Sequence, residues 1–296
     1  MKVLNYGSLN VDYVYSVDHI IIGGETQHSS KLEVFSGGKG LNQSIALAKA
    51  GVPVYHAGIV GNDGDILLEA CKEAGVNTKY IRRLPVKGGH TMIQVDKNAQ
   101  NCIILYGGTN QMQTKEFVDE VLADFSEGDY LILQNEINML DYIIDQAYEK
   151  KMKIVMNPSP FDDKLSTCDL SKVYLFLVNE IEGEQITGCK DKDQILDAMA
   201  AKFPNARFVL TLGSNGAVYY DGKEKVFQDI FKVKAVDTTA AGDTFTGYFI
   251  AAAIGGRSIQ EALRMAAKAS SIAVSRPGAT PSIPRVEEVK KELGML

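Results

Sequence analysis

The chain has 296 residues, of which 45% are hydrophobic and 23% are charged, a composition typical of a folded protein that buries a substantial core. Its 31 lysines and arginines against 37 aspartates and glutamates give a net charge of −6 without a dense basic run, so we expect neither nucleic acid nor membrane as a partner. The four cysteines are scattered without metal-type spacing, and no apolar leader follows Lys2, which predicts a soluble cytoplasmic protein with reduced thiols.

The first apolar segment, residues 3–8, predicts a strand that ends in a turn of small residues. Asn10 and Asp12 follow it directly. Open α/β sheets bind ligands at the carboxyl ends of their strands, so both side chains are candidate ligand contacts, with turn formation as the alternative. Residues 13–17 and 31–35 then alternate between apolar and polar, which predicts a pair of exposed strands that form a flap.

A glycine-rich segment precedes the first predicted helix, at residues 44–50. Its sequence is Gly37-Gly38-Lys39-Gly40-Leu41-Asn42-Gln43. Glycines at a helix start let a ligand approach the backbone, and Lys39 and Asn42 could donate hydrogen bonds to sugar oxygens. The segment is not a Walker phosphate loop, because Gly40 stands where that loop has Ser or Thr. A flexible turn with a solvated lysine is the alternative interpretation.

The middle of the chain alternates between predicted strands and predicted helices. A hairpin over 91–95 and 102–105, with its turn at 97–100, can pair with the first flap. The other predicted strands cover 54–60, 130–133, 153–156, 174–178 and 208–212, and the helices 66–74, 115–123, 140–149 and 195–202. This order predicts an α/β fold with a parallel sheet covered by helices on both faces.

Several of these strands run into polar residues. They are followed by Gln134-Asn135-Glu136, by residues 179–182, and by residues 213–216 after Thr211. Each group alone could be a helix cap or a loop. Their recurrence at the carboxyl ends of parallel strands favours a shared ligand site.

Residues 237–245 lie between a predicted strand over 231–236 and a predicted buried helix over 245–254. The free N–H groups and the dipole of a helix start favour a bound anion, and three small residues there leave room for one. The carboxylate of Asp243 is placed in this anion-binding position. It is either a first-turn acid that complements the dipole, with Thr238 or Thr239 as the cap, or a base beside a bound phosphate.

The last segments of the chain are a helix opened by a capping box at 258–261, a proline-rich loop at 276–284 and a closing charged helix. The loop has carbonyl groups that no helix uses. The loop could merely connect the two helices, or it could coordinate a hard cation through backbone oxygens.

Together these segments resemble the ribokinase-like, or phosphofructokinase-B type, family of carbohydrate kinases. The two diagnostic segments are residues 37–43 and 237–243, and the likeness extends through 7–12, 179–182 and 211–216. The Gly-Gly-Lys-Gly-x-Asn-Gln form of the first segment is more similar to ribokinases than to the sugar-phosphate kinases.

The resemblance implies a single domain over residues 1–296. Its expected fold is a ribokinase-like three-layer α/β/α sandwich with a mostly parallel central sheet and a small β-sheet lid. The lid would come from residues of about 12–36 and 88–110. In ribokinases this lid also pairs two subunits, so a homodimer through the lid is expected.

The resemblance also implies a role for each matching position. The sugar would contact Asn10, Val11, Asp12, Gly38, Lys39, Gly40, Leu41, Asn42, Glu136 and Asp243. ATP would contact Asn179, Glu182, Thr211, Leu212, Gly213, Ser214, Asn215, Gly216 and Gly242, with Glu182 acting near Mg²⁺ through water. Asp243 would be the base, and the anion hole would consist of the N–H groups of Ala240, Ala241 and Gly242. A potassium ion would bind at Asp237, Thr239, Ala273, Arg276, Gly278 and Ser282.

The expected reaction is transfer of the γ-phosphoryl group of ATP to the primary hydroxyl of a free sugar, with D-ribose giving ribose 5-phosphate. Kinases of the same family acting on deoxyribose, a nucleoside or another sugar are the alternatives. A nucleotide-dependent oxidoreductase is disfavoured because no G-x-G-x-x-G follows the first strand, and an inactive sugar sensor because Asp243 is retained. Ala267 stands where ribokinases usually have Asn or His beside adenine, which leaves the nucleotide preference open.

Overall fold

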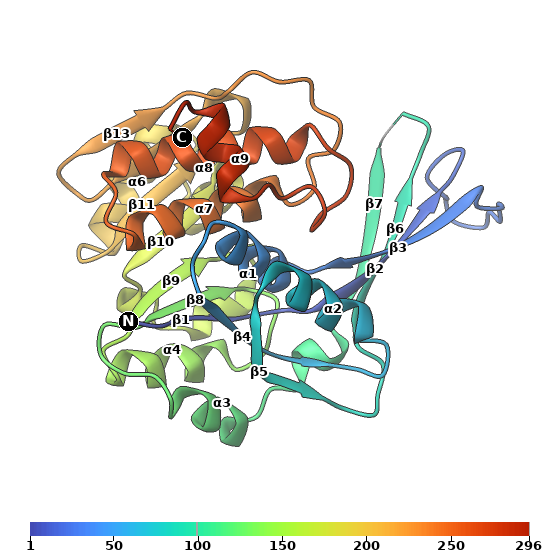
Figure 1. The fold of residues 1–296 in the computed structure, drawn as a ribbon, viewed down its shortest axis with the longest axis horizontal. Coiled ribbons are helices and arrows are strands. Elements are labelled where there is room, and N and C mark those ends of the chain that lie inside the picture. The colour runs from blue at the N-terminus through green and yellow to red at the C-terminus, as the bar shows by residue number, and fades with distance from the viewer. Residues whose placement is uncertain (99, 296) are drawn as a thin grey trace.

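The structure of the protein is a computed structural model that describes residues 1–98 and 100–295 (Figure 1). Its strands form a nine-stranded main sheet and a four-stranded small sheet. In spatial order, the main sheet within these residues consists of β13 (Lys225–Gln228), β12 (Ala217–Tyr220), β11 (Arg207–Thr211), β10 (Leu175–Asn179), β9 (Lys153–Asn157), β8 (Tyr130–Gln134), β1 (Val3–Tyr6), β4 (Val54–Val60) and β5 (Asn77–Arg83).

Seven neighbouring strands of the main sheet, from β11 to β5, are parallel, and the hairpin of β12 and β13 extends the sheet antiparallel at one edge. All four residues of β1 and most residues of β8 and β10 are buried. Continuous apolar runs of this kind are expected for strands covered on both faces. The prediction of a mostly parallel α/β sheet is therefore confirmed.

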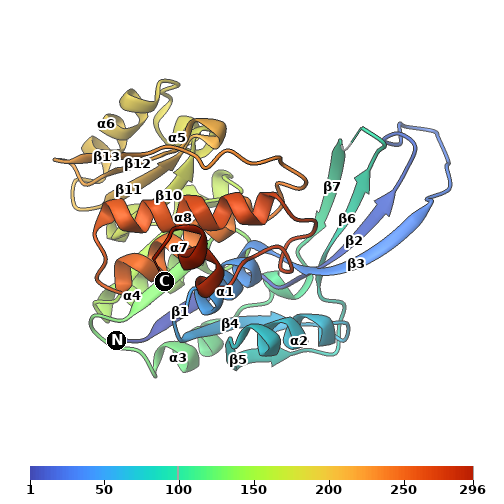
Figure 2. The same ribbon diagram turned by 45° about the horizontal axis from the view of Figure 1, so that its top comes forward.

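Two groups of helices cover the two faces of the main sheet (Figure 2). One core cluster contains apolar side chains from α1 (Lys39–Lys49), α2 (Asp65–Ala74), α7 (Ala241–Ile254), α8 (Ile259–Val274) and α9 (Val286–Glu292). The other cluster contains side chains from α3 (Lys115–Leu122), α4 (Leu140–Glu149), α5 (Glu180–Thr187) and α6 (Lys192–Lys202). This is the expected three-layer α/β/α sandwich. In the described part of the chain, no helix combines the length and the apolar character that a bilayer span requires.

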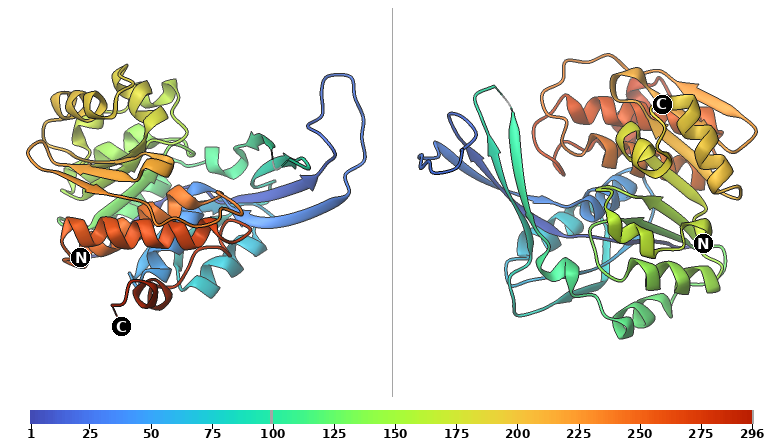
Figure 3. Two further views of the ribbon diagram at one scale, coloured as in Figure 1. Left: turned by 90° about the horizontal axis from the view of Figure 1, so that it is seen from above. Right: turned by 180° about the vertical axis from the view of Figure 1, so that it is seen from behind.

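The small sheet projects from one end of the sandwich (Figures 1 and 3). Its strands, in spatial order, are β3 (Lys31–Gly37), β2 (Asn10–Ser16), β6 (Gly89–Val95) and β7 (Asn101–Tyr106). The two predicted strand pairs are both antiparallel, and they join through parallel pairing of β2 with β6, as expected. Ala99, in the predicted turn of the second hairpin, lies outside the described residues.

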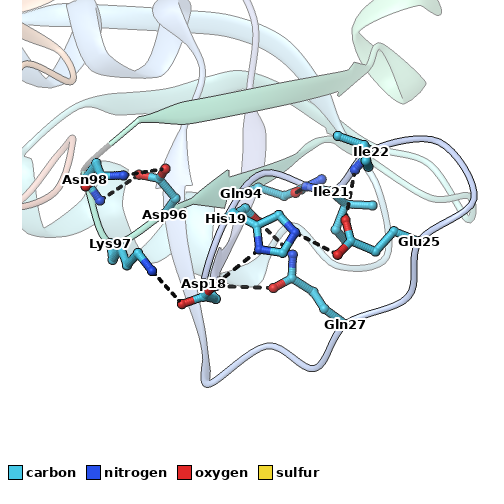
Figure 4. A network of polar contacts seen from close by, with 10 residues as sticks. All are labelled: Asp18, His19, Ile21, Ile22, Glu25, Gln27, Gln94, Asp96, Lys97 and Asn98. Carbon is cyan, nitrogen blue, oxygen red and sulfur yellow. Dashed lines mark hydrogen bonds and ion pairs between the residues drawn. The ribbon is translucent and has the colours of Figure 1, made fainter.

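A network of polar contacts connects the segments at the tip of the small sheet (Figure 4). Gln94 Oε1 accepts a hydrogen bond from the backbone N–H of Ile21 at 2.9 Å, and Lys97 Nζ lies 3.1 Å from Asp18 Oδ1. His19 hydrogen-bonds with the carboxylates of Asp18 and Glu25, which raise its pKa. Because these groups are exposed, salt screens the interactions between their charges.

The predicted strand over residues 231–236 is wrong. The chain leaves β13 and has no regular secondary structure from 229 to 236. The backbone N–H groups of Val236 and Asp237 donate instead to the carbonyl of Val274, at the end of α8, at 2.7 and 3.2 Å. This segment therefore borders a helix end rather than another strand.

Candidate active site

The carboxyl ends of several strands and the first turns of α1, α5 and α7 converge on one cavity of about 260 Å³. Asp243 lies in the first turn of α7, is only 7% exposed and lines this cavity. Its Oδ2 accepts a hydrogen bond from Asn42 Nδ2, and its Oδ1 accepts one from Gln43 Nε2, both at 2.9 Å. Two amides from α1 thus fix the orientation of the carboxylate.

The start of α7 leaves space above its backbone. Ala240, the N-cap residue, has a left-handed conformation with φ 59° and no side-chain cap. A Cβ atom added to Gly242 would contact no atom within 4 Å. The N–H of Ala241 already donates to the carbonyl of Thr238 at 3.2 Å, whereas the N–H of Gly242 has no acceptor within the described chain. Of the expected anion-hole donors, the one of Ala241 is therefore engaged in this structure.

Glu136 and Lys39 lie at the sugar side of the predicted site. Glu136 Oε2 accepts hydrogen bonds from the Ser8 hydroxyl and, at 3.0 Å, from the backbone N–H of Lys39. Burial raises the pKa of Glu136, although the ammonium of Lys39 opposes the rise. Burial also works to lower the pKa of Lys39, but nearby carboxylates outweigh it and raise that pKa. These carboxylates belong to Asp243, Glu136 and Glu182.

Asn10 and Asp12 belong to strand β2 rather than to a turn, so the alternative interpretation as turn formers is wrong. Asp12 Oδ1 accepts a hydrogen bond from Thr91 Oγ1 at 2.6 Å, and Asn10 Oδ1 accepts one from Asn110 Nδ2 at 2.7 Å. A Cβ atom at Gly37 would lie 1.9 Å from Asp12 Oδ2, so glycine is required beside it. Burial raises the pKa of Asp12 to about 6.

A second cavity, of about 740 Å³, adjoins the first, and both are lined by Asn179, Thr211 and Gly242. Of the predicted ATP contacts, it is also lined by Gly213, Ser214 and Gly216, but not by Leu212 or Asn215. Ala267 from α8 lines it as well. The side chain there ends at a methyl group and offers no hydrogen bond to a base.

Asn179 and Glu182 form a capping box at the start of α5. Glu182 Oε2 accepts from the backbone N–H of Asn179 at 3.0 Å, and its Oε1 accepts from Asn179 Nδ2 at 3.1 Å. Glu182 is 4% exposed and lines the smaller cavity. Each oxygen of the Glu182 carboxylate therefore accepts one hydrogen bond within the described chain and keeps a lone pair that a water molecule could use.

Asp237 joins the two segments of the predicted cation site. Its Oδ1 accepts from the N–H of Thr239 at 2.8 Å, and its Oδ2 accepts from the N–H of Gly278 at 2.9 Å. These bonds lower the pKa of Asp237, although burial opposes them. The carbonyl of Ala273 accepts from the N–H of Arg276 at 3.0 Å, while within the described chain no donor reaches the carbonyls of Arg276 and Gly278. A carboxylate with free carbonyls fits a hard cation.

Sequence reasoning missed the polar side chains that support the site from behind. Gln43 lies in the glycine-rich segment but has no predicted role, and Asn5 falls inside a predicted strand. Gln134 is predicted only as one of three polar residues after a strand, without a role of its own. All three are fully buried. The available signal was a polar residue inside an apolar strand, because a buried amide needs hydrogen-bond partners.

Comparison with known proteins identifies the family of the chain. The model of the pfkB family carbohydrate kinases matches residues 1–286. A ribokinase of Haemophilus influenzae is 33% identical over 95% of both chains, and a deoxyribokinase of Salmonella typhi is 27% identical over 100% of this chain and 99% of its own.

Solved structures show the same fold. Ribokinase from Thermotoga maritima has a TM-score of 0.87 at 33% identity, covering 99% of each chain. Arabidopsis thaliana ribokinase, complexed with ribose and ATP, has a TM-score of 0.86 at 29% identity, covering 99% of this chain and 98% of its own. The family model and these relatives span nearly the whole chain, and the protein therefore belongs to the pfkB family of carbohydrate kinases.

Proposed function

We propose that the protein is an ATP-dependent kinase that phosphorylates the primary hydroxyl of a free sugar, with D-ribose as the substrate and ribose 5-phosphate as the product. The observation that carries the proposal is the position of Asp243. Its carboxylate is fixed by two amides in a cavity that adjoins a larger pocket suited to a nucleotide.

Asp243 acts as the base of this reaction. A sugar hydroxyl is far less acidic than a carboxylic acid, so the carboxylate orients the hydroxyl oxygen and accepts its proton late, in a loose transition state. The start of α7 and the ammonium of Lys39 stabilise the negative charge of the transferred phosphoryl group. Mg²⁺, when bound, would neutralise further phosphate charge, and Glu182 would contact it through water.

The sugar contacts lie between β2, α1 and the loop after β8. Asp12 and Glu136 accept hydrogen bonds from sugar hydroxyls there. Asn42 Oδ1 is buried and without a partner in the described chain, so it is left to accept another. The ribokinases among the relatives favour ribose, and the Arabidopsis structure contains ribose and ATP. Deoxyribose is the second candidate because of the deoxyribokinase relative.

The test is sugar-dependent ADP release from ATP and Mg²⁺ with a panel of ribose, deoxyribose, other pentoses, hexoses and nucleosides. We expect the highest kcat/KM with D-ribose, with phosphate attached at O5. A higher kcat/KM with deoxyribose than with D-ribose would identify deoxyribose as the substrate instead. Absence of sugar-dependent ADP release across the panel would overturn it.

The pKa of Asp12 predicts a pH dependence of sugar binding. Because burial raises that pKa to about 6, Asp12 gains a proton and loses acceptor capacity as the pH falls from 7 to 5. The KM for the sugar should therefore rise over this range, with a smaller change in kcat. Asp12→Asn should raise KM at pH 7 and flatten its pH dependence. An unchanged KM in the variant would exclude Asp12 from sugar binding.

The same raised pKa has a consequence for stability. The folded-state pKa exceeds the usual value of 3.8, so ionising Asp12 costs free energy of folding, and that cost grows as the pH rises from 4 to 6. Asp12→Asn removes the ionisation. Its Tm relative to the wild type should accordingly be higher at pH 7 than at pH 4, which separates a folding effect from a sugar-binding effect.

The cation site is expected to bind K⁺ through Asp237, Thr239 and the loop 276–282. The ion would fix the backbone next to Ala240 and Gly242, and so it would organise the anion hole rather than contact the sugar. Replacing Li⁺ with K⁺ at equal ionic strength should raise kcat and lower the ATP KM, and Asp237→Ala should reduce this response. Equal kinetics of the wild type in the two salts would exclude the ion.

The small sheet is expected to be a lid that also pairs two copies of the chain. Residues paired directly across strands share a face, and Val34, Tyr13, Met92 and Ile104 form one such row. Asp12 and Thr91 point to the opposite face. Three residues of the row are largely exposed, with Ile104 at 61%, and uncovered apolar sheets favour association.

Sedimentation measures this association. We expect a dimer at micromolar concentration, and Ile104→Lys together with Met92→Lys should convert it to a monomer. The matched change Ile22→Lys alters an apolar residue that is 70% exposed but lies outside the row, and it should leave the dimer intact. A monomeric wild type would reject the dimer.

A further inference from the structure

A row of buried amides connects the catalytic carboxylate to the backbone of α1. We call it the amide chain, and it consists of Asn5 in β1, Gln134 at the end of β8 and Gln43 in α1. Gln43 Nε2 donates to Asp243 Oδ1 at 2.9 Å. Gln134 Nε2 donates to Gln43 Oε1 at 2.7 Å and to Asn5 Oδ1 at 2.9 Å. Asn5 Nδ2 donates to the backbone carbonyl of Gly40 at 2.7 Å.

The direction of every amide in this chain follows from its fixed end. A backbone carbonyl can only accept, so Asn5 must present its NH₂ group to Gly40 and its Oδ1 to Gln134. Gln134 must then donate to Asn5, and the same NH₂ group donates to Gln43. Gln43 consequently has its oxygen occupied on the Gln134 side and its NH₂ group directed at Asp243. The amide chain ends at the backbone carbonyl of Gly40, which can only accept. For that reason the other end of the amide chain presents an N–H donor, rather than an oxygen, to the carboxylate of Asp243.

A second backbone carbonyl sets the same direction from the other side. Asn157 Nδ2 donates to the carbonyl of Leu177 at 2.8 Å. This bond places Asn157 Oδ1 as an acceptor, 3.2 Å from Gln43 Nε2. The two hydrogens of the Gln43 amide therefore have two acceptors, Asp243 and Asn157, and reversing the amide would leave neither satisfied.

Gln134 keeps this direction at a cost. Its Oε1 is buried and accepts no hydrogen bond from the described residues. A Cβ atom at Gly7 would lie 2.2 Å from that oxygen, so glycine makes room for the orientation observed. A buried carbonyl oxygen without a hydrogen-bond partner is unfavourable, because it has lost its contact with water.

We propose that the amide chain positions the catalytic base: Gln43 and Gln134 are positioning residues that hold the Asp243 carboxylate as an oriented hydrogen-bond acceptor. This proposal rests on the proposed kinase function. Gln134 does not contact Asp243 and acts through Gln43. The charged groups that face Asp243 are Lys39 from α1, Glu136 from the loop after β8, and Glu182 from α5.

Gln134→Glu is the decisive variant because it changes no atom next to Asp243. An ionised carboxylate at position 134 can only accept, so Gln43 must turn its NH₂ group towards it and its Oε1 towards Asp243. Asn5 Oδ1, which accepts from Gln134 in the wild type, loses that donor. An oxygen beside the carboxylate favours the protonated acid. We expect kcat to fall on the order of 10–100-fold, the value of one hydrogen bond to a charged group. The acid limb of the kcat profile should move to higher pH, with the sugar KM changed only a few-fold.

Gln113→Glu is the matched control. Gln113 is also a buried glutamine, 3% exposed, and its Oε1 accepts from the Tyr6 hydroxyl at 3.1 Å, outside the amide chain. It undergoes the same chemical change, so its pH profile should follow that of the wild type. Gln134→Met removes the hydrogen bonds without forcing Gln43 to reverse, and it should lower kcat less than Gln134→Glu while leaving the acid limb closer to that of the wild type.

The outcomes separate the two proposals. If the wild type phosphorylates a sugar but folded Gln134→Glu keeps its kcat and acid limb, the positioning role is overturned and the kinase function stands. If neither the wild type nor Gln113→Glu releases ADP with any sugar, the kinase function fails and this proposal with it. Should Gln134→Glu not fold, Gln43→Met gives the same decision, because it should lower kcat at an almost unchanged sugar KM, and an unchanged kcat would overturn the role.

Discussion

Asp243→Asn is expected to lower kcat by about 10²–10⁴-fold, the range of general-base contributions, with a much smaller change in sugar affinity. The amide has nearly the shape of the carboxylate but cannot accept the proton of the sugar hydroxyl. The NH₂ group of the new asparagine also has to face Asn42 or Gln43, each of which presents a donor to the native carboxylate. Some destabilisation should therefore accompany the loss of activity.

Steady-state kinetics and calorimetric sugar binding together measure this prediction. Asp141→Asn is a matched control, because Asp141 is also an acid in the first turn of a helix, α4, but is exposed. If Asp243 served only to complement the dipole of α7, both variants would lose a few tenths of a kcal/mol of stability and neither would lose activity. Asp243→Asn with a kcat within a few-fold of the wild type would exclude the base.

The fold was largely predictable because its signals are local. Buried strands such as β8 and β10 are short apolar runs, and glycines such as Gly51 and Gly75 follow the helices before them. The segment 231–236 has the alternation of an edge strand and yet is not one. Phe231, Val233 and Ala235 line the 740 Å³ cavity. Alternation of apolar and polar residues shows that one side of a segment is apolar. It does not show whether that side packs in a sheet or lines a pocket.

The site was predictable only as far as its motifs extended. Asp243, Lys39 and Asn179 were identified because each lies in a recognisable segment, and the structure brings them to the same cavity. The partners of these residues were not predictable. Gln43 and Asp243 are separated by 200 positions in the chain, so their contact depends on how α1 packs against α7. No short sequence pattern predicts how these two helices pack.

The close packing of α1 against α7 depends on Gly247, and Gly247→Ala is expected to disturb both folding and catalysis. A Cβ atom at this position would lie 2.4 Å from Ala46 Cβ and 3.0 Å from two backbone atoms of α1. Backbone cannot move aside as a flexible side chain can, so the two helices must separate. Overpacking of this kind destabilises by about 1–3 kcal/mol.

Separating α1 from α7 should also affect the proposed active site, because the contact between Gly247 and Ala46 lies one helical turn from the site on both helices. Gly247 follows Asp243 by four residues, and Ala46 follows Asn42 by four, so each pair lies on one face of its helix. Moving α1 from α7 should therefore lengthen the 2.9 Å bonds from Asn42 and Gln43 to Asp243. Displacing the proposed base should lower kcat more than it raises the ATP KM, because the proposed nucleotide pocket lies between α7, α8 and β11.

Two further variants distinguish the effect of the clash between α1 and α7 from the effect of replacing any helical glycine. Gly183→Ala is a helical control in α5, where the added Cβ would clash with a side-chain atom, Ile195 Cγ2, at 2.7 Å, and would approach no backbone atom of a neighbouring element. A side chain can shift further than a helix backbone, so thermal unfolding should show a smaller loss of Tm. Ala46→Gly in the Gly247→Ala background removes the nearest clash and should recover kcat in part, even though a second helical glycine costs about 0.5–1 kcal/mol relative to alanine. If Gly247→Ala alone retains the wild-type kcat, the distance between α1 and α7 does not control the position of the base.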